Sequence, residues 1–387
     1  MRTRTLSTAV IFIALPLLQA AESTPTPLLT GDLSFRNEVQ HAIDKGLAWF
    51  QANQNTNGYW SSADEPAVTA LALSAFMGEP TGRYLKTPSP AVNAGYQFVL
   101  SKVHEDGSIC GADLQNYNTS ICLMALLAAH KSEYDPIILR ARQWVIGAQM
   151  STNGNGKIDP AMAGGVGYER DPSRSDLSNT LVALEALYYS KQVAADKNQI
   201  GAKDLDWNAA IHFIQSCQNL PEYNKESWAS GDSTNKGGFI YYPGRSMAGS
   251  ETNAEGRVAF RSYGSISYAG LLSYIYADLK HDDARVQAAF DWLRANYTVK
   301  ENPALGDAGY YYYLHLMSKG LSTYGVNELE LKDGRKIDWR REVATRILNL
   351  QKADGSWAND NGRWLEKDPA LVTAYALIAL DLICPKI

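Results

Sequence analysis

The stretch TRILNLQKADGSW (345–357), followed by TAYALIAL (373–380), contains the unit from which this chain is built. An amphipathic segment ends near a Gln, a glycine turn carries an aromatic or apolar residue, and a second apolar segment follows. The same order occurs six times. The other first segments are LAWFQANQ (47–54), YQFVLSKV (96–103), RQWVIGAQ (142–149), IHFIQSCQ (211–218) and FDWLRANY (290–297). Apolar residues at helical spacing predict that each unit is a helical hairpin.

The second segment of each unit is the more apolar one. The remaining five are TALALSAF (69–76), TSICLMAL (119–126), TLVALEAL (180–187), SYAGLLSYI (267–275) and YYLHLMSKGL (312–321). The last repeat, 371–380, is apolar on nearly every face and therefore needs a neighbour on both sides. A linear solenoid would instead end in polar capping repeats. We therefore expect an all-α fold, an α/α toroid of about twelve helices, as a single domain over residues 36–387.

The first twenty residues have the pattern of a secretory signal peptide. Arg2 and Arg4 precede a short apolar run, 9–15, and small residues follow at Ala20 and Ala21. We expect cleavage there, a flexible lead-in over 21–35, no transmembrane span after removal of the signal, and a secreted or periplasmic protein.

Composition excludes several classes of function. The formal net charge is −5 without a basic block, so nucleic acid is a poor partner. The four cysteines are widely spaced; Cys110 and Cys217 are candidates for a pair, Cys122 is expected to be a buried hydrophobe, and Cys384 has no assigned partner. No histidine lies at a metal-ligand spacing from a cysteine, so we expect neither a metal site nor a cofactor.

The repeated motif resembles a known one. Trp49, Gln54 and Gly58-Tyr59-Trp60, and likewise Gln351 and Gly355-Ser356-Trp357, are similar to the prenyltransferase and squalene-oxidase repeat. That family includes triterpene cyclases and the β-subunits of protein prenyltransferases, and the resemblance covers nearly the whole mature chain. It implies an α/α toroid with a central cavity for an apolar, isoprenoid-like ligand.

The resemblance does not extend to the catalytic motifs of the family. The chain has no D-x-D-D motif, no Asp-x-Cys pair for zinc and no thioester sequence. Three hypotheses therefore stay open: a terpenoid-cyclase-like or prenyltransferase-like protein with an apolar ligand, a secreted polysaccharide-degrading enzyme of the lyase type, and a non-catalytic protein that binds a ligand or peptide. Whether the chain is an enzyme is left undecided.

Carboxylates recur just before the apolar segments. They are Asp64 or Glu65, Asp113, Asp176, Asp307 and Asp368. Such residues can cap helices. In a closed ring they would instead crowd one mouth of the cavity, where mutual repulsion makes acid–base groups. Asp176, Asp113 and Asp368 are the catalytic candidates, together with His315, for which a satisfied core histidine is the alternative.

Candidate ligand-binding residues surround the same mouth. In the fourth repeat Arg261 and Tyr263 take the place of the acid, and Arg261 would bind a ligand anion or pair with an acid. The run 310–313 consists of four tyrosines that cannot share one helix face, so some line the cavity, as cation–π partners or as ordinary packing. The full set of candidate ligand-binding residues is Arg174, Asn179, Arg261, Tyr263, Tyr268, Tyr311, Tyr312 and Trp364.

Overall fold

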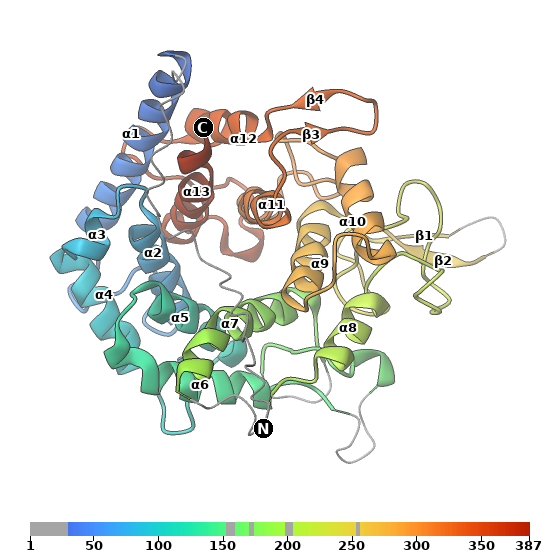
Figure 1. Cartoon of the computed structure of the whole chain (residues 1–387), viewed down its shortest axis with the longest axis horizontal. Helices are drawn as coiled ribbons and strands as arrows, with labels where there is room; N and C mark the ends of the chain where they lie inside the picture. The colour runs from blue at the N-terminus through green and yellow to red at the C-terminus, as the bar shows by residue number, and fades with distance from the viewer. Residues whose placement is uncertain (1–29, 152–158, 170–173, 198–203, 253–255) are drawn as a thin grey trace, which may run out of the picture.

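Six apolar helices form the inner wall of a closed ring (Figure 1). The computed structural model describes residues 30–151, 159–169, 174–197, 204–252 and 256–387. The inner helices are α2 (Pro66–Gly78), α5 (Gln115–Ala128), α7 (Leu177–Asp196), α9 (Gly264–Tyr276), α11 (Tyr310–Tyr324) and α13 (Pro369–Ile383). Each packs against the next in this order, and α13 packs against α2, so the ring closes between the last repeat and the first.

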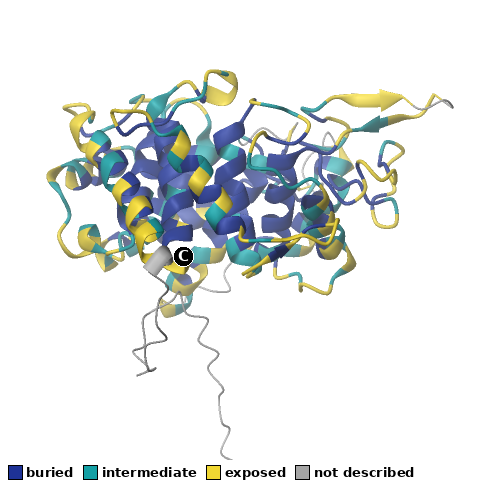
Figure 2. Cartoon of the chain, turned by 90° about the horizontal axis from the view of Figure 1, so that it is seen from above, coloured by how far each residue is buried: buried dark blue, intermediate teal, exposed yellow. Residues whose placement is uncertain are grey.

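Six amphipathic helices form the outer layer. They are α1 (Thr30–Ala52), α4 (Pro90–Ser101), α6 (Asp135–Gly147), α8 (Trp207–Ser216), α10 (Ala284–Ala295) and α12 (Trp339–Leu350). Figure 2 shows the buried residues concentrated in the inner layer and the exposed ones outside it. The predicted α/α toroid and its closure are both confirmed.

Short elements complete the described chain. They are helix α3 (Arg83–Lys86), the 3₁₀ helices η1 (Ser132–Tyr134), η2 (Pro160–Met162), η3 (Arg363–Leu365) and η4 (Cys384–Lys386), and two antiparallel strand pairs, β1 (Ser250–Thr252) with β2 (Val258–Phe260) and β3 (Leu329–Glu330) with β4 (Lys336–Ile337). The β1–β2 arm projects from the ring (Figure 2). The expected signal peptide lies outside the described residues. Of the expected lead-in, residues 30–35 are helical and belong to α1.

The Gln of the repeat connects neighbouring hairpins. In four repeats its amide donates to two carbonyl oxygens at 2.8–3.0 Å, one in its own glycine turn and one at the outer helix of the next repeat. The donors and acceptors are Gln54 with Gly58 and Ala91, Gln149 with Gly164 and Asp206, Gln218 with Gly237 and Arg285, and Gln351 with Gly355 and Ala42. The last of these joins the two ends of the chain.

The glycine of the turn is needed for the same contact. Gly355 has φ +94°, and a Cβ there would lie 2.6 Å from the carbonyl oxygen of Lys45 in α1. Only glycine combines this left-handed conformation with such a close backbone approach. Within each hairpin a hydroxyl anchors the turn: the backbone N–H of Trp357 donates to Thr373 Oγ1 at 3.0 Å, and four other repeats have the equivalent bond.

Replacing Gln351 by Ala should lower the free energy of unfolding by about 1–3 kcal/mol, because two carbonyl oxygens at the ring closure lose their donor. Urea unfolding measures this loss. The matched control is Gln192→Ala, whose amide bonds only to Asp196 on an exposed helix face and which should change stability by less than about 0.5 kcal/mol. Equal losses in the two variants would show that the closure bond has no special weight.

Candidate functional site

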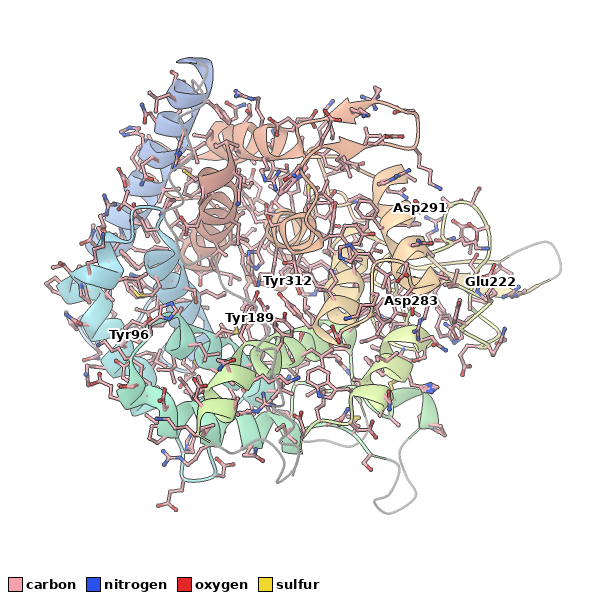
Figure 3. The ribbon with its side chains drawn as sticks, in the orientation of Figure 1. Tyr96, Tyr189, Glu222, Asp283, Asp291 and Tyr312 are labelled. Atoms are coloured by element: carbon pink, nitrogen blue, oxygen red, sulfur yellow. The ribbon has the colours of Figure 1, made fainter. Side chains whose placement is uncertain are left out.

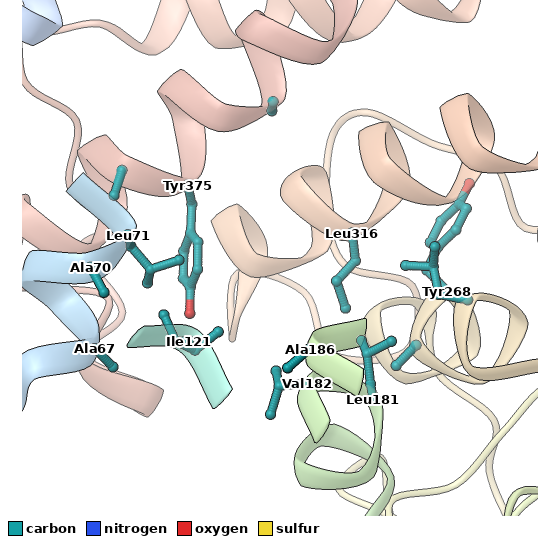
Figure 4. Close-up of a cluster of buried hydrophobic side chains, with 14 of the residues drawn as sticks. Ala67, Ala70, Leu71, Ile121, Leu181, Val182, Ala186, Tyr268, Leu316 and Tyr375 are labelled. Atoms are coloured by element: carbon teal, nitrogen blue, oxygen red, sulfur yellow. The ribbon is translucent and has the colours of Figure 1, made fainter. Parts of the chain in front are cut away.

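The ring encloses two neighbouring chambers that share part of their walls. The mouth chamber, about 270 Å³, lies at the N-terminal ends of the inner helices and is bordered by Glu65, Tyr263 and Trp364. The deep chamber, about 670 Å³, lies between the C-terminal halves of these helices and contains Leu71, Ile121, Val182 and Leu316 in its wall. Figure 4 shows Tyr375 beside Leu71 and Ile121, with Val182 and Leu316 across from it. Both chambers have mainly apolar and aromatic walls.

Three tyrosines from three inner helices separate the chambers, and we call Tyr117, Tyr312 and Tyr375 the tyrosine belt because all three line both spaces. The Tyr117 and Tyr375 hydroxyls lie 3.1 Å apart, and Tyr312 Oη lies 3.0 Å from Ser178 Oγ. Figure 3 shows Tyr312 at the centre of the ring. Burial raises the pKa of Tyr117 to about 12, so its hydroxyl stays protonated at neutral pH. The belt therefore presents neutral hydroxyl groups and aromatic faces.

Asp176 lies behind the wall of the mouth chamber and caps α7. Its carboxylate accepts hydrogen bonds from the backbone N–H and the side-chain amide of Asn179, both at 2.9 Å. The side chain is buried, and this burial raises its pKa to about 6, while bonds from Asn179 and Tyr241 and the charge of Arg174 act in the opposite direction. The prediction that Asp113, Asp307 and Asp368 crowd this group was wrong, because the pKa shift of Asp176 comes from burial and not from other carboxylates.

The acidic mouth does exist, centred on Glu65. Burial raises the pKa of Glu65, and the charges of Asp368, Asp64 and Asp113 raise it further. Asp113 itself is exposed. Asp368 caps α13 by accepting from the N–H of Ala370, and it also accepts from the hydroxyl of Ser61. The structure thus places two of the three aspartates predicted as catalytic at the mouth as partners of Glu65.

The predicted arginines do not reach the chambers. Arg261 is exposed and pairs with Glu251 of the β1–β2 arm, Nε to Oε1 at 2.6 Å, so the placement of Arg261 among the mouth acids was wrong. Arg174 lies over the ring of Tyr242, with its guanidinium carbon 5.7 Å from the ring centroid. It acts on Asp176 through its charge.

The aromatic candidates divide between wall and core. Tyr263 and Trp364 line the mouth chamber, and Tyr312 lines both chambers. Tyr268 packs against Tyr313, with ring centroids 5.9 Å apart, and Tyr311 is buried beside Tyr310; neither borders a chamber, so they are not ligand-binding residues there. As the tyrosine run predicted, its members point in different directions.

His315 lines the deep chamber. Its ring stacks on Tyr375, with centroids 5.2 Å apart and planes 28° apart. Burial, aided by the charge of Lys319, lowers the pKa of His315 well below its usual value of 6.5, so the imidazole is neutral.

Three charged residues of the site were missed from the sequence. Glu185 and Lys319 form an ion pair in the wall of the deep chamber, and buried Glu366 accepts a hydrogen bond from the N–H of Tyr312 at the start of α11. The sequence does contain a signal for the first two, since each is a lone charge within an apolar inner segment. Glu366 carries no such signal, because its partner lies 54 residues away.

The structure also bears on the cysteines, on metal sites and on membrane-spanning helices. All four cysteines are buried and free, so Cys110 and Cys217 do not pair. Among the residues that the structure describes, no cluster of His, Cys, Asp or Glu is arranged to hold a metal ion. In that part of the chain one helical segment, Pro369–Lys386, is apolar and long enough to cross a membrane, and 72% of it is buried as the inner wall of the ring.

Comparison with known proteins identifies the fold. No protein-family model and no curated protein matches the chain. A variant of the type II terpene cyclase MstE from Scytonema, in complex with geranylgeranyl dihydroxybenzoate, shares 12% identity over 92% of this chain and 99% of the cyclase, with a TM-score of 0.53. An inactive variant of an alpha-1,6-mannanase from Salegentibacter, in complex with alpha-1,6-mannotriose, shares 9% identity over 90% of this chain and 100% of the mannanase, with a TM-score of 0.54. Both are similar to this chain as α/α toroids, and at this identity the likeness establishes the fold and not the activity.

Asp176 should make stability depend on pH in a recognisable way. Because its pKa is raised from 3.8 to about 6 on folding, the native state binds the proton more tightly, and stability falls as pH rises through this range. The loss corresponds to roughly 3 kcal/mol at most. Asp176→Asn, which still caps the helix, should remove this loss and be at least as stable as the wild type at pH 7.

The control is another helix cap with the opposite shift. Hydrogen bonds from Arg285 lower the pKa of Asp283 at the start of α10, so Asp283→Asn should lose stability relative to wild type as pH rises through the acid range. Urea unfolding at pH 3, pH 4 and pH 7 compares the two variants, because the effect of Asp283 changes mainly below pH 4 and that of Asp176 mainly above it. A large loss in Asp176→Asn at pH 7 would mean that the carboxylate is a required charged partner.

Proposed function

We propose that this chain binds an elongated, mainly apolar small molecule of the isoprenoid type along the axis of its toroid. The observation that carries the proposal is the character of the chamber walls. Aliphatic side chains such as Leu71, Ile121 and Leu316 and the tyrosine belt line the two chambers. The deep chamber alone, about 670 Å³, falls within the range of roughly 300–1,000 Å³ of small-molecule sites.

The carboxylates that line the chambers match a polysaccharide hydrolase poorly, although Asp64, Asp113 and Asp368 lie around Glu65 at the mouth without lining a chamber. Glycoside hydrolysis normally needs two carboxyl groups that flank the bond to be broken. Of the described residues that line the chambers, three carry carboxylates: Glu65, Asp135 and Glu185. Asp135 pairs with Lys197, Oδ2 to Nζ at 3.1 Å, and Glu185 pairs with Lys319 at 2.8 Å. Two of the three are thus engaged in ion pairs within the protein.

Turnover of the bound molecule is a second candidate, favoured by Glu65. Its raised pKa at the mouth of an aromatic chamber suits a proton donor, and the faces of the belt tyrosines suit a developing positive charge. Binding without reaction is the simpler proposal, because the chain lacks the catalytic motifs of the enzymes that its repeats resemble.

We further propose that binding takes place outside the cytoplasm, because residues 1–20 have the pattern of a signal peptide.

Filling the deep chamber should abolish binding. Val182 lies in its wall on α7, and Val182→Trp would place an indole in the empty space while the helix stays intact. We expect geranylgeraniol to bind the wild type and to bind this variant at least about tenfold more weakly in titration calorimetry. The matched control is Val258→Trp on the exposed β2 strand, which should bind like the wild type.

Two results would contradict the proposal. One is geranylgeraniol binding that is equal in the two Trp variants, since the ligand then lies elsewhere. The other is tighter binding of alpha-1,6-mannotriose than of geranylgeraniol, which would favour the polysaccharide hypothesis. Mass spectrometry of the ligand after incubation distinguishes binding from turnover.

A further inference from the structure

A polar stripe of the deep chamber lies along α11, apart from polar residues such as Lys131 and Asp135 elsewhere in the wall. Tyr312, His315 and Lys319 follow one another at spacings of three and four residues, so they share one helix face, and all three line the chamber. Glu185 of α7 lines it from the neighbouring segment of the wall. A ligand that fills the chamber must lie against this stripe.

The two charges of the stripe are already satisfied by the protein. Lys319 Nζ donates to both carboxylate oxygens of Glu185, at 2.8 and 3.0 Å. The hydroxyl of Tyr276 donates to the same carboxylate at 3.2 Å. The side chains of Lys319 and Glu185 are only 18% and 6% exposed, so the pair is largely shielded from water. Its charges cancel, and neither group needs a ligand.

His315 is the member of the stripe that lacks a partner. The residue is 4% exposed and borders the chamber, and its Nδ1 atom finds no hydrogen-bond partner among the described residues. Nδ1 is itself shielded from the chamber, so Nε2 is the ring nitrogen that remains for a ligand. Stacking on Tyr375 holds the ring in place. A buried polar group without a partner costs free energy and needs an explanation, and a bound molecule is one such explanation. The imidazole, neutral in this environment, offers one N–H donor and one lone pair.

We propose that His315 binds a single neutral oxygen, a hydroxyl or carbonyl group, of an otherwise apolar ligand in the deep chamber. This inference rests on the proposed function and adds the class of ligand. A neutral imidazole can donate to or accept from such an oxygen. It provides no charge to balance a phosphate or carboxylate. Of the two lysines in the chamber wall, Lys319 is held by Glu185, and Lys131 pairs with Glu133 at 3.7 Å. An anionic group at this place would also meet the Glu185 carboxylate.

The experiment compares three probes of similar length that differ in their ends. They are geranylgeraniol, the matching hydrocarbon without the hydroxyl (2,6,10,14-tetramethylhexadeca-2,6,10,14-tetraene) and geranylgeranyl diphosphate, each delivered from cyclodextrin. The wild type should bind geranylgeraniol about fivefold more tightly than the hydrocarbon, the contribution of one hydrogen bond, and more tightly than the diphosphate. His315→Phe should bind the alcohol and the hydrocarbon equally, with the affinity for the hydrocarbon unchanged. His315→Gln keeps a donor and an acceptor and should retain part of the preference.

His281→Phe is the matched control. It makes the same substitution at a histidine whose ring stacks on Tyr324, with centroids 4.2 Å apart, and neither residue lines a chamber, so the preference for the alcohol should persist. Thermal melts establish whether each variant is folded. If His315→Phe does not fold, His315→Gln still tests the inference.

Each other outcome overturns the inference in a distinguishable way. If the wild type binds alcohol and hydrocarbon equally well, the inference fails while the proposed function stands. If the preference survives undiminished in both His315 variants, or disappears in His281→Phe, His315 is not the group that recognises the hydroxyl. Tighter binding of the diphosphate would mean an anion site. If none of the probes binds, the proposed function fails and the inference falls with it.

Discussion

The architecture depends on one interaction: the Gln side chain of four repeats donates hydrogen bonds to two backbone carbonyl groups, one in its own turn and one at the next repeat. A toroid of hairpins has no continuous backbone ladder between repeats, so each repeat must be joined to the next by side chains. Gln54, Gln149, Gln218 and Gln351 do this with the same pair of bonds, and Gln351 joins the end of the chain to α1. The glycine carbonyl accepts one bond, while the absent glycine Cβ allows the next outer helix to approach. The Gln motif, the glycine turn and the closure of the ring therefore depend on the same pair of hydrogen bonds.

The cavity follows from this closure. Once six inner helices are fixed side by side, the residues that face the axis have no helix opposite to pack against. Those at the middle of the wall are bulky. Tyr117 and Tyr375 meet there through their hydroxyls, and Tyr312 packs against Tyr375 with ring centroids 5.7 Å apart. The remaining apolar side chains border empty space. A buried apolar surface that the protein itself leaves uncovered is the physical basis for proposing an apolar ligand.

Polar groups in such a wall have to be accounted for individually. Asp176 accepts hydrogen bonds from Asn179 that offset part of the cost of its burial, and the charge of Glu185 is balanced by Lys319 with a further bond from Tyr276. The nitrogen of His315 stands apart because no described residue bonds to it. Asp176 and Glu185 therefore have structural roles, whereas His315 is available to a ligand.

The sequence by itself determined the repeat, the two layers, the closed ring and the direction of the inner helices, because helical periodicity and the glycine turns are local properties of the chain. It also indicated that members of the tyrosine run would point in different directions. Which of them face the axis was decided only by the tertiary structure, since helix rotation depends on packing against neighbours. Helix capping was likewise predictable only in part from the sequence. Asp176 and Asp368 cap their own helices, whereas α2, α9 and α11 receive hydrogen-bond acceptors from Asn118, Asn302 and Glu366 in other segments. The pKa of Asp176 and the placement of Arg261 on the arm likewise arise from burial and from contacts made only when distant segments meet, and a linear sequence contains neither.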